Sequence, residues 1–174
     1  MITFQKIRWK NFLSTGDHWS EIDFLGHTTN LVVGTNGSGK STMLDALTFS
    51  LFNKPFRKIN KSQLINATNE KDCVVEVEFT VNNKDYLVRR SIKPNKFDIE
   101  VNGTLLHKES DDRLNQKILE ESILKVNYKS FTQIVILGSS SFVPFMQLST
   151  SNRRDVIEDL LDIRIFSAMN SLIK

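Results

Sequence analysis

The sequence LVVGTNGSGKSTMLDALTFSLF, residues 31–52, decides how the rest of the chain is interpreted. It contains the pattern G-x-x-x-x-G-K-[ST] from Gly34 to Ser41, after an apolar run and before a leucine-rich segment. Glycines in such a loop let successive backbone N–H groups turn inward around phosphate oxygens without Cβ clashes. The pattern therefore predicts a strand at 30–33, a phosphate-binding loop (P-loop) and then a helix.

The roles expected of the loop residues follow from charge and position. The helix N-terminus offers unpaired N–H groups and a partial positive charge, and Lys40 adds a full charge near the β and γ phosphates. We expect Lys40 to act in catalysis and Ser41 to ligate magnesium. The cofactor-binding residues predicted in the loop are Gly34, Asn36, Gly37, Ser38, Gly39, Lys40, Ser41 and Thr42. A glycine-rich turn that binds nothing is the alternative, and the flanking strand and helix patterns argue against it.

The base of the nucleotide is not read by this loop. Guanine-reading proteins normally carry N-K-x-D, and the two nearest approximations, Asn69–Asp72 and Asn83–Asp85, have the wrong order or spacing. We therefore expect ATP with Mg²⁺ as the cofactors.

The composition is that of an ordinary globular protein. With 174 residues, 40% hydrophobic and 25% charged, the chain fits one domain with a real core, and it falls outside the disordered, fibrous and membrane classes. The formal net charge of +3 does not by itself indicate a nucleic-acid partner. The single cysteine, Cys73, excludes an internal disulfide, and the first residues lack a secretory signal. We expect an intracellular location, with no membrane association.

The hydrophobic pattern predicts an α/β fold with a mixed sheet. Strands are expected at 2–9, 19–24, 30–33, 73–81, 85–92 and 131–137, and a hairpin around Asn102–Gly103 completes an antiparallel meander. A largely buried helix is expected at 40–52, a long loop at 53–72, and helices at 110–126 and from about Asn152. No C-cap ends the last helix before Lys174, so it either continues in a longer parent or docks as a terminal helix.

The second half of a hydrolytic site is missing from the sequence. Hydrolysis in P-loop enzymes needs an acidic residue on a neighbouring strand for magnesium, and no run of four apolar residues ends in Asp-Glu. Glu76 and Glu78 alternate on a predicted strand, where a solvated sheet face is the simpler interpretation. The chain is predicted to bind nucleotide without a complete active site.

The residues resemble those of a known family. The segments KNFLSTGDHWSEIDF, NLVVGTNGSGKSTMLDALTFSLF and FTQIVILGSSSFVPFMQLSTSNRRDVIEDLL are together similar to the N-terminal half of the ATPase head of SbcC-type recombination ATPases, which are relatives of chromosome-maintenance (SMC) proteins with ABC-type heads. The resemblance is strongest to the phage branch of that family. It runs over essentially the whole chain.

The resemblance implies an architecture and partners. Residues 1–150 would form the N-terminal lobe of the head, and 151–174 would begin a coiled coil that leads to a C-terminal lobe holding the acidic strand. The family implies ATPase activity in the assembled head, a homodimer of heads on ATP binding, DNA, and a partner nuclease that processes double-strand breaks. The isolated lobe would hydrolyse ATP weakly or not at all. In a phage-encoded protein the location would be the host cytoplasm.

The resemblance also carries individual residues over. Ser14 matches a position near the nucleotide, and Ile65, Asn66 and Ala67 match residues on the adenine side. Leu13 stands where many members have Arg, so one polar contact differs. The loop glutamine of the family, eight residues after the match to Phe131, is replaced here by Ser139, and Gln133 is predicted to be an ordinary strand residue.

Two basic clusters could contact DNA, and the sequence does not decide whether they do. They are Lys54, Arg57, Lys58 and Lys61, and Arg89, Arg90, Lys93 and Lys96. Each cluster is either a solvated face or a phosphate-contacting surface. Two other functions also fit a P-loop: a nucleotide kinase or other phosphotransferase, and a non-hydrolysing structural DNA-clamp module.

Overall fold

The computed structural model describes residues 2–106, 111–136, 145–161, 163 and 169. The chain forms two compact units, Met1–Ile118 and Leu119–Lys174. The predicted boundary between lobe and coiled coil at 150/151 stays a prediction, and each unit is described separately below.

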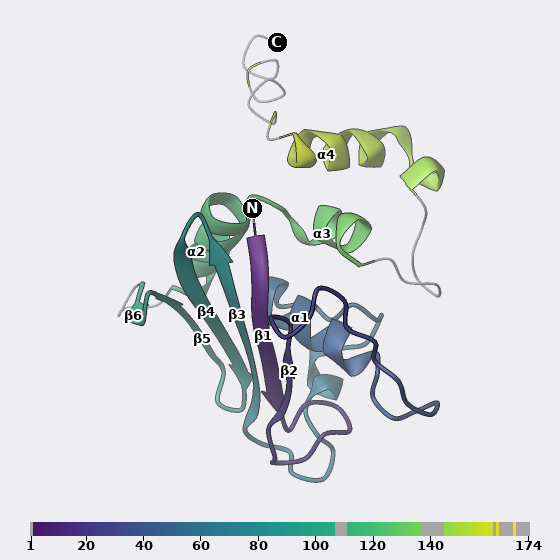
Figure 1. The fold of residues 1–174 in the computed structure, drawn as a ribbon, viewed down its shortest axis with the longest axis vertical. Coiled ribbons are helices and arrows are strands. Elements are labelled where there is room, and N and C mark those ends of the chain that lie inside the picture. Colours follow the sequence, from purple (N-terminus) through teal and green to yellow (C-terminus); the bar gives the residue numbers. More distant parts are fainter. Residues whose placement is uncertain (1, 107–110, 137–144, 162, 164–168, 170–174) are drawn as a thin grey trace. The chain divides into compact units, whose positions relative to one another are not determined.

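The first unit is built on a six-stranded sheet with the order β2-β1-β3-β4-β5-β6, as Figure 1 shows. Every neighbouring pair of strands is antiparallel. The strands are β1 (Ile2–Lys10), β2 (Ser20–Asp23), β3 (Cys73–Val81), β4 (Lys84–Ile92), β5 (Lys96–Val101) and β6 (Thr104–Leu105). The predicted meander is confirmed, and so is the α/β class.

Alternation along the strands separates a core face from a polar face. On β3, Val75, Val77 and Phe79 are fully buried, and they alternate with polar residues on the other face. Helix α1 (Thr42–Phe52) packs against β1, β3 and β4, with Phe49 and Leu51 fully buried. A helix that buries most of its surface is apolar on more than one face, and the polar residues that α1 also buries include Thr48 and Ser50, whose hydroxyls donate to backbone carbonyls of the same helix. The prediction of a largely buried helix after the P-loop is therefore confirmed.

The rest of the first unit consists of loops and short helices. The predicted long loop after α1 contains one 3-10 turn, η1 (Lys61–Leu64), in accord with its lack of a sustained period. Helix α2 (Asp112–Lys117) contacts β5, and the chain then enters a π-helix, η2 (Ile118–Leu124), of which all but the first residue belong to the second unit. The helix predicted near 110–126 is thereby confirmed.

Two predicted strands are wrong, and with them the mixed sheet. Residues 30–33 form no strand, and Leu31 and Val33 are 87% and 81% exposed. The segment from Phe131 instead forms helix α3 (Tyr128–Ile134), which also places Gln133 on a helix. Apolar runs this short do not distinguish a strand from a helix by periodicity, and a strand needs a neighbouring strand to complete its hydrogen bonds. Every pair of strands in the described residues is antiparallel, so the sheet is not the mixed one that was predicted.

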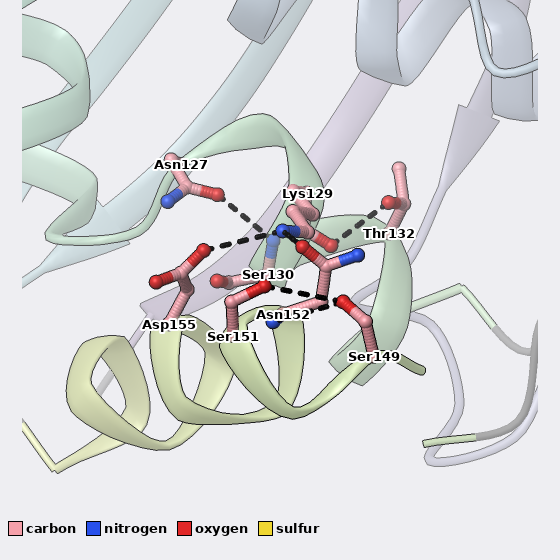
Figure 2. A network of polar contacts seen from close by, with 8 residues as sticks. All are labelled: Asn127, Lys129, Ser130, Thr132, Ser149, Ser151, Asn152 and Asp155. Carbon is pink, nitrogen blue, oxygen red and sulfur yellow. Dashed lines mark hydrogen bonds and ion pairs between the residues drawn. The ribbon is translucent and has the colours of Figure 1, made fainter. Parts of the chain in front are cut away.

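The second unit contains α3 and α4 (Thr150–Leu160) in contact with each other, and a short turn, η3 (Phe145–Gln147). Figure 2 shows Lys129 of α3 directed at α4, where its ammonium bonds Asn152 and lies 3.2 Å from an Asp155 carboxylate oxygen. Each helix begins at a side-chain cap: Asn127 accepts from the Ser130 N–H at 2.9 Å, and Ser149 accepts from the Asn152 N–H at 3.4 Å. The last helix thus begins two residues before the predicted start.

Candidate nucleotide-binding site

The P-loop places glycines where other residues would be strained or would clash. Gly37 and Gly39 have φ angles of +86° and +94°, a backbone conformation that side chains with a Cβ rarely adopt. Gly34 is favoured for a different reason, since a Cβ there would lie 2.4 Å from the Ser38 hydroxyl oxygen and the Ser38 side chain would have to move. The predicted need for glycine at these positions therefore has two separate physical causes.

The backbone amides of the loop form a donor surface. Within the described part of the chain, no hydrogen bond uses the N–H of Gly37, Gly39, Lys40 or Ser41 as its donor. The exposed Ser41 hydroxyl likewise caps no helix N–H, although Ser41 stands at the N-cap of α1. Amide groups that precede a helix in this manner attract anions, because the helix dipole adds to their own polarity.

The Lys40 side chain curls back over its own loop. Its ammonium donates to the carbonyl oxygens of Gly34 at 2.5 Å and Thr35 at 2.8 Å. Both hydrogen bonds are exposed to solvent. The only full positive charge of the loop is therefore held beside the free amides.

A cavity of about 460 Å³ opens over these amides and lies within the first unit. This volume is within the usual range of small-molecule sites. Its lining comes from three separate segments of the chain: Leu13, Ser14, Asn36, Gly37, Gly39, Lys40, Ser41, Thr42, Arg57, Gln63, Ile65 and Ala67. The structure thus brings Ser14, Ile65 and Ala67 to the P-loop.

Three predicted site residues lie outside this lining. A Cβ on Gly34 would meet the Ser38 side chain, and Ser38 lines a separate hollow of about 230 Å³ together with Gly39 and Lys40. Asn66 is 9% exposed, and its side-chain amide donates to the carbonyl oxygens of Leu13 and Thr15, each at 3.1 Å. It holds the Ser14 segment in place rather than facing the cavity.

The Ser14 segment is attached to the Ile65 segment by backbone bonds as well. Phe12 and Ile65 form an isolated antiparallel bridge, and the Leu13 N–H donates to Leu64 O at 2.6 Å. The Asn66 N–H donates to Asn11 O at 2.9 Å. These long-range bonds form one wall of the cavity, which local sequence patterns cannot reveal.

Arg57 is the clearest residue of the cavity that the sequence pattern did not assign to it. Its guanidinium pairs with the carboxylate of Asp45, a fully buried residue one turn into α1, with an Nε–Oδ2 distance of 2.6 Å. The Arg57 N–H also donates to Asp45 Oδ1 at 2.9 Å. Asp45 thereby attaches the 53–60 loop to α1 and holds a cation beside the P-loop. An acidic residue within a helix that was predicted to be largely buried was the available signal.

Gln63 and Leu13 complete the lining. The side chain of Gln63 accepts from the Asn60 N–H at 2.9 Å, which stabilises η1. Leu13 adopts a left-handed φ of +54°, as the sharp turn after β1 requires. At this position the cavity has an apolar wall where the family resemblance suggested an arginine.

The carboxylates of β3 have a structural role. Glu76 is 3% exposed, and its two carboxylate oxygens each lie 2.5 Å from a guanidinium nitrogen, one of Arg8 and one of Arg89. The expected solvated face is therefore wrong for Glu76, because two arginines cover it. Hydrogen bonding to Glu76 raises the pKa of Arg89. The position of Ser139 lies outside the described residues.

Comparison with known proteins agrees with this geometry. A family model described as an AAA domain matches residues 6–173. The chain belongs to this AAA domain family.

This AAA domain also has individual relatives. It is 43% identical over 169 residues to exonuclease subunit 2 of Enterobacteria phage T4. The matched region covers 97% of this chain and 30% of that protein. It is 30% identical to a subunit of the SbcCD nuclease of Staphylococcus aureus, covering 88% of the chain and 17% of that protein. It is 26% identical to the DNA double-strand break repair Rad50 ATPase of Thermoplasma volcanium, covering 98% of the chain and 19% of that protein. The AAA domain thus spans less than a third of the length of these relatives.

A solved structure from work on ATP-driven dimerization and DNA-stimulated activation of SMC ATPases has the same fold as the AAA domain. It matches with a TM-score of 0.62 and 25% identity, covering 91% of this chain and 99% of that one. The resemblance to SbcC-type ATPases with SMC-like heads is confirmed by these matches. No helix in the described residues of the AAA domain is long and apolar enough to cross a membrane.

Proposed function

We propose that this AAA domain is the ATP-binding N-terminal lobe of a DNA repair and recombination ATPase, which couples ATP hydrolysis to DNA processing by a partner nuclease. One observation carries the proposal: free P-loop amides, an uncapped hydroxyl and a lysine meet in one cavity with side chains from two distant segments. The names of the relatives agree with it, since they are nuclease subunits and repair ATPases.

In this proposal each part of the cavity has a role. The amides of residues 37–41 bind the phosphate oxygens, and Lys40 leaves its two exposed carbonyl partners for the β and γ phosphates. Ser41 ligates Mg²⁺ through its free hydroxyl. Ser14, Ile65 and Ala67 lie beside the ribose and adenine, and Asn66 holds that wall together.

The proposed assembly follows from what this lobe lacks and from its relatives. No carboxylate of the described residues lines the cavity, so the acidic group needed for hydrolysis would come from a C-terminal lobe. We expect two heads to join when ATP binds, as the SMC work describes for its own protein. DNA and a nuclease subunit are the other proposed partners.

The test is a calorimetric titration of the chain with ATP at a fixed Mg²⁺ concentration. Lys40→Ala removes a charged phosphate contact, so we expect affinity to fall roughly tenfold or more. Ser41→Ala should weaken binding in Mg²⁺ and change little in EDTA. Lys84→Ala, at an exposed site at the start of β4, is the control and should leave affinity unchanged.

The outcomes separate the three functions. ATP binding with negligible turnover by the isolated chain supports the lobe proposal, and rapid turnover would contradict it. Phosphate transfer to a small-molecule acceptor would instead indicate a phosphotransferase. Failure of both the native chain and Lys40→Ala to bind would indicate a structural clamp with a vestigial loop.

A further inference from the structure

A second hollow, of about 310 Å³, lies in the first unit and shares no lining residue with the nucleotide cavity. It is formed where the β4–β5 hairpin meets η1, α2 and the end of α1. Its lining is Asn53, Lys61, Arg90, Asn95, Lys96, Phe97, Asp112, Arg113 and Gln116. We refer to it below as the basic hollow.

The basic hollow is strongly positive for its size. Four cations line it, Lys61, Arg90, Lys96 and Arg113, against the single carboxylate of Asp112. The Asp112 carboxylate accepts from the Asn95 side-chain amide at 3.3 Å. Among the described residues, none forms an ion pair with Lys61, Lys96 or Arg113. Cations gathered in one concavity without paired carboxylates raise the local concentration of anions.

Arg90 forms the floor and is held rigidly. It is 4% exposed, and its guanidinium lies 3.6 Å from the centre of the Phe97 ring. Its Nε donates to Ser50 O at 3.0 Å, and a terminal nitrogen donates to Gln116 Oε1 at 2.6 Å. The planar group is therefore fixed in orientation before any ligand arrives, which lowers the entropy cost of binding.

The end of α1 does not oppose an anion in this hollow. The last carbonyl groups of a helix carry partial negative charge, which repels anions. Here Ser50 O accepts from Arg90, and Leu51 O accepts from the Gln116 side chain at 2.9 Å. These contacts neutralise the helix end toward the hollow.

Lys61 is held close to a second cation. Its ammonium donates to Asn95 Oδ1 at 3.3 Å, and burial together with the Arg90 charge lowers its pKa. An anion bound in the hollow would offset the unfavourable effect of the Arg90 charge on Lys61, in the same direction as the nearby Asp112 carboxylate.

Members of the two basic clusters differ in whether they pair with a buried carboxylate or line the basic hollow. Arg57 and Arg89 are paired with the buried carboxylates of Asp45 and Glu76. Lys61, Arg90 and Lys96 instead meet in the hollow, where Arg113, from outside both clusters, joins them. Residues that are neighbours in each basic cluster of the sequence therefore lie in different places in the structure, and the two clusters do not form two continuous surfaces.

We propose that the basic hollow is a binding site for a phosphate group, either of a nucleic-acid backbone or of a free phosphoanion. The Arg113 guanidinium and the Lys61 and Lys96 ammonium groups supply charged donors, and the side-chain amides of Asn53 and Asn95 supply neutral ones. The inference stands apart from the nucleotide cavity and does not require ATP to bind there.

The first test uses inorganic phosphate as the probe and nitrogen-correlated NMR as the measurement. At constant ionic strength, phosphate should shift the side-chain amide signals of Asn95 and Gln116 in a saturable manner. The double variant Lys96→Gln, Arg113→Gln should weaken this binding at least about fivefold, since it removes two of the charged donors that line the hollow. Both side chains are exposed, so these changes spare the core. The P-loop glycine amides report on the other site separately.

The second test asks whether the bound phosphate group belongs to a nucleic-acid backbone or to a free phosphoanion. It uses a fluorescent DNA duplex and an anisotropy titration. If the phosphate is that of DNA, the double variant should weaken duplex binding and lower the slope of log affinity against log salt by about 1 per lost contact. Lys84→Gln, at the opposite end of the same hairpin, should change neither value.

Either source of phosphate supports the site. Saturable amide shifts with inorganic phosphate, together with duplex binding that the double variant leaves unchanged, would identify a free phosphoanion. The proposal is overturned if Asn95 and Gln116 do not respond to phosphate and duplex binding is equal in the native chain and the double variant. Loss of ATP binding in Lys40→Ala bears on neither result, so this proposal and the proposed function fail separately.

Discussion

The two sides of the P-loop differ in how they are held. After the loop, α1 is buried against three strands, and Ala46, Phe49 and Leu51 have no exposed surface. Before the loop, residues 30–33 form no strand, and Leu31 is 87% exposed. The amides are thus positioned from the helix side, by packing on α1 and by glycines with positive φ angles.

In this structure the P-loop has its geometry without a strand at residues 30–33. The helix fixes the direction of the amides, and the Asp45–Arg57 pair attaches the neighbouring loop to that helix. The apolar segment before the loop packs little against the other described residues, so it contributes little to the stability of the fold. Substitutions on the two sides should therefore have very different effects.

The largest effect is expected from Phe49→Ala. The ring is fully buried, and its centre lies 5.8 Å from that of the Phe12 ring. Removing it leaves a cavity, so the free energy of unfolding should fall by about 3–5 kcal/mol in urea denaturation. Leu31→Ala is the matched change on the other side and should cost less than about 0.5 kcal/mol. Comparable losses from both variants would show that the segment before the loop is packed as well.

An intermediate effect is expected from Arg57→Ala, which removes the guanidinium partner of a buried carboxylate. The arginine side chain is 46% exposed, and solvent therefore screens part of the interaction. We expect a loss of about 1–3 kcal/mol of unfolding free energy, because Asp45 remains buried with fewer donors.

A double-mutant cycle sharpens this prediction. In an Asp45→Asn background, Arg57→Ala should cost clearly less, since no buried charge is left behind. Equal costs in the two backgrounds, measured by urea denaturation, would mean that the pair does not attach the loop to α1.

The smallest effect is expected from Gly39→Ala. Its φ of +94° is strained for alanine, while the nearest atom that a Cβ would meet is the Thr42 hydroxyl at an ordinary 3.5 Å. The cost should be about 1 kcal/mol, from backbone strain alone. Gly26→Ala is the control, because a Cβ there meets nothing within 4 Å and the φ angle is not positive. A loss in the control as large as that in Gly39→Ala would contradict the assignment of strain to the loop.

Much of the fold was predictable because its signals are local. Alternation in 73–81 and 85–92 and the Asn102–Gly103 turn predicted the meander, and the apolar pattern of 40–52 predicted a buried helix. The segments at 30–33 and 131–137 were misjudged because both are apolar runs whose structure depends on neighbours. In the second, the cap from Asn127 favours a helix.

The sequence by itself determined where the P-loop lies, since its glycines, lysine and hydroxyl fall within nine consecutive residues. Only the tertiary structure decided what surrounds it. The wall that joins Ser14 to Ile65, the pairing of Arg57 with Asp45, and the meeting of four cations in the basic hollow each join segments far apart in the chain. Backbone and side-chain contacts of that kind depend on how the whole sheet and helix pack, and no local pattern of residues encodes them.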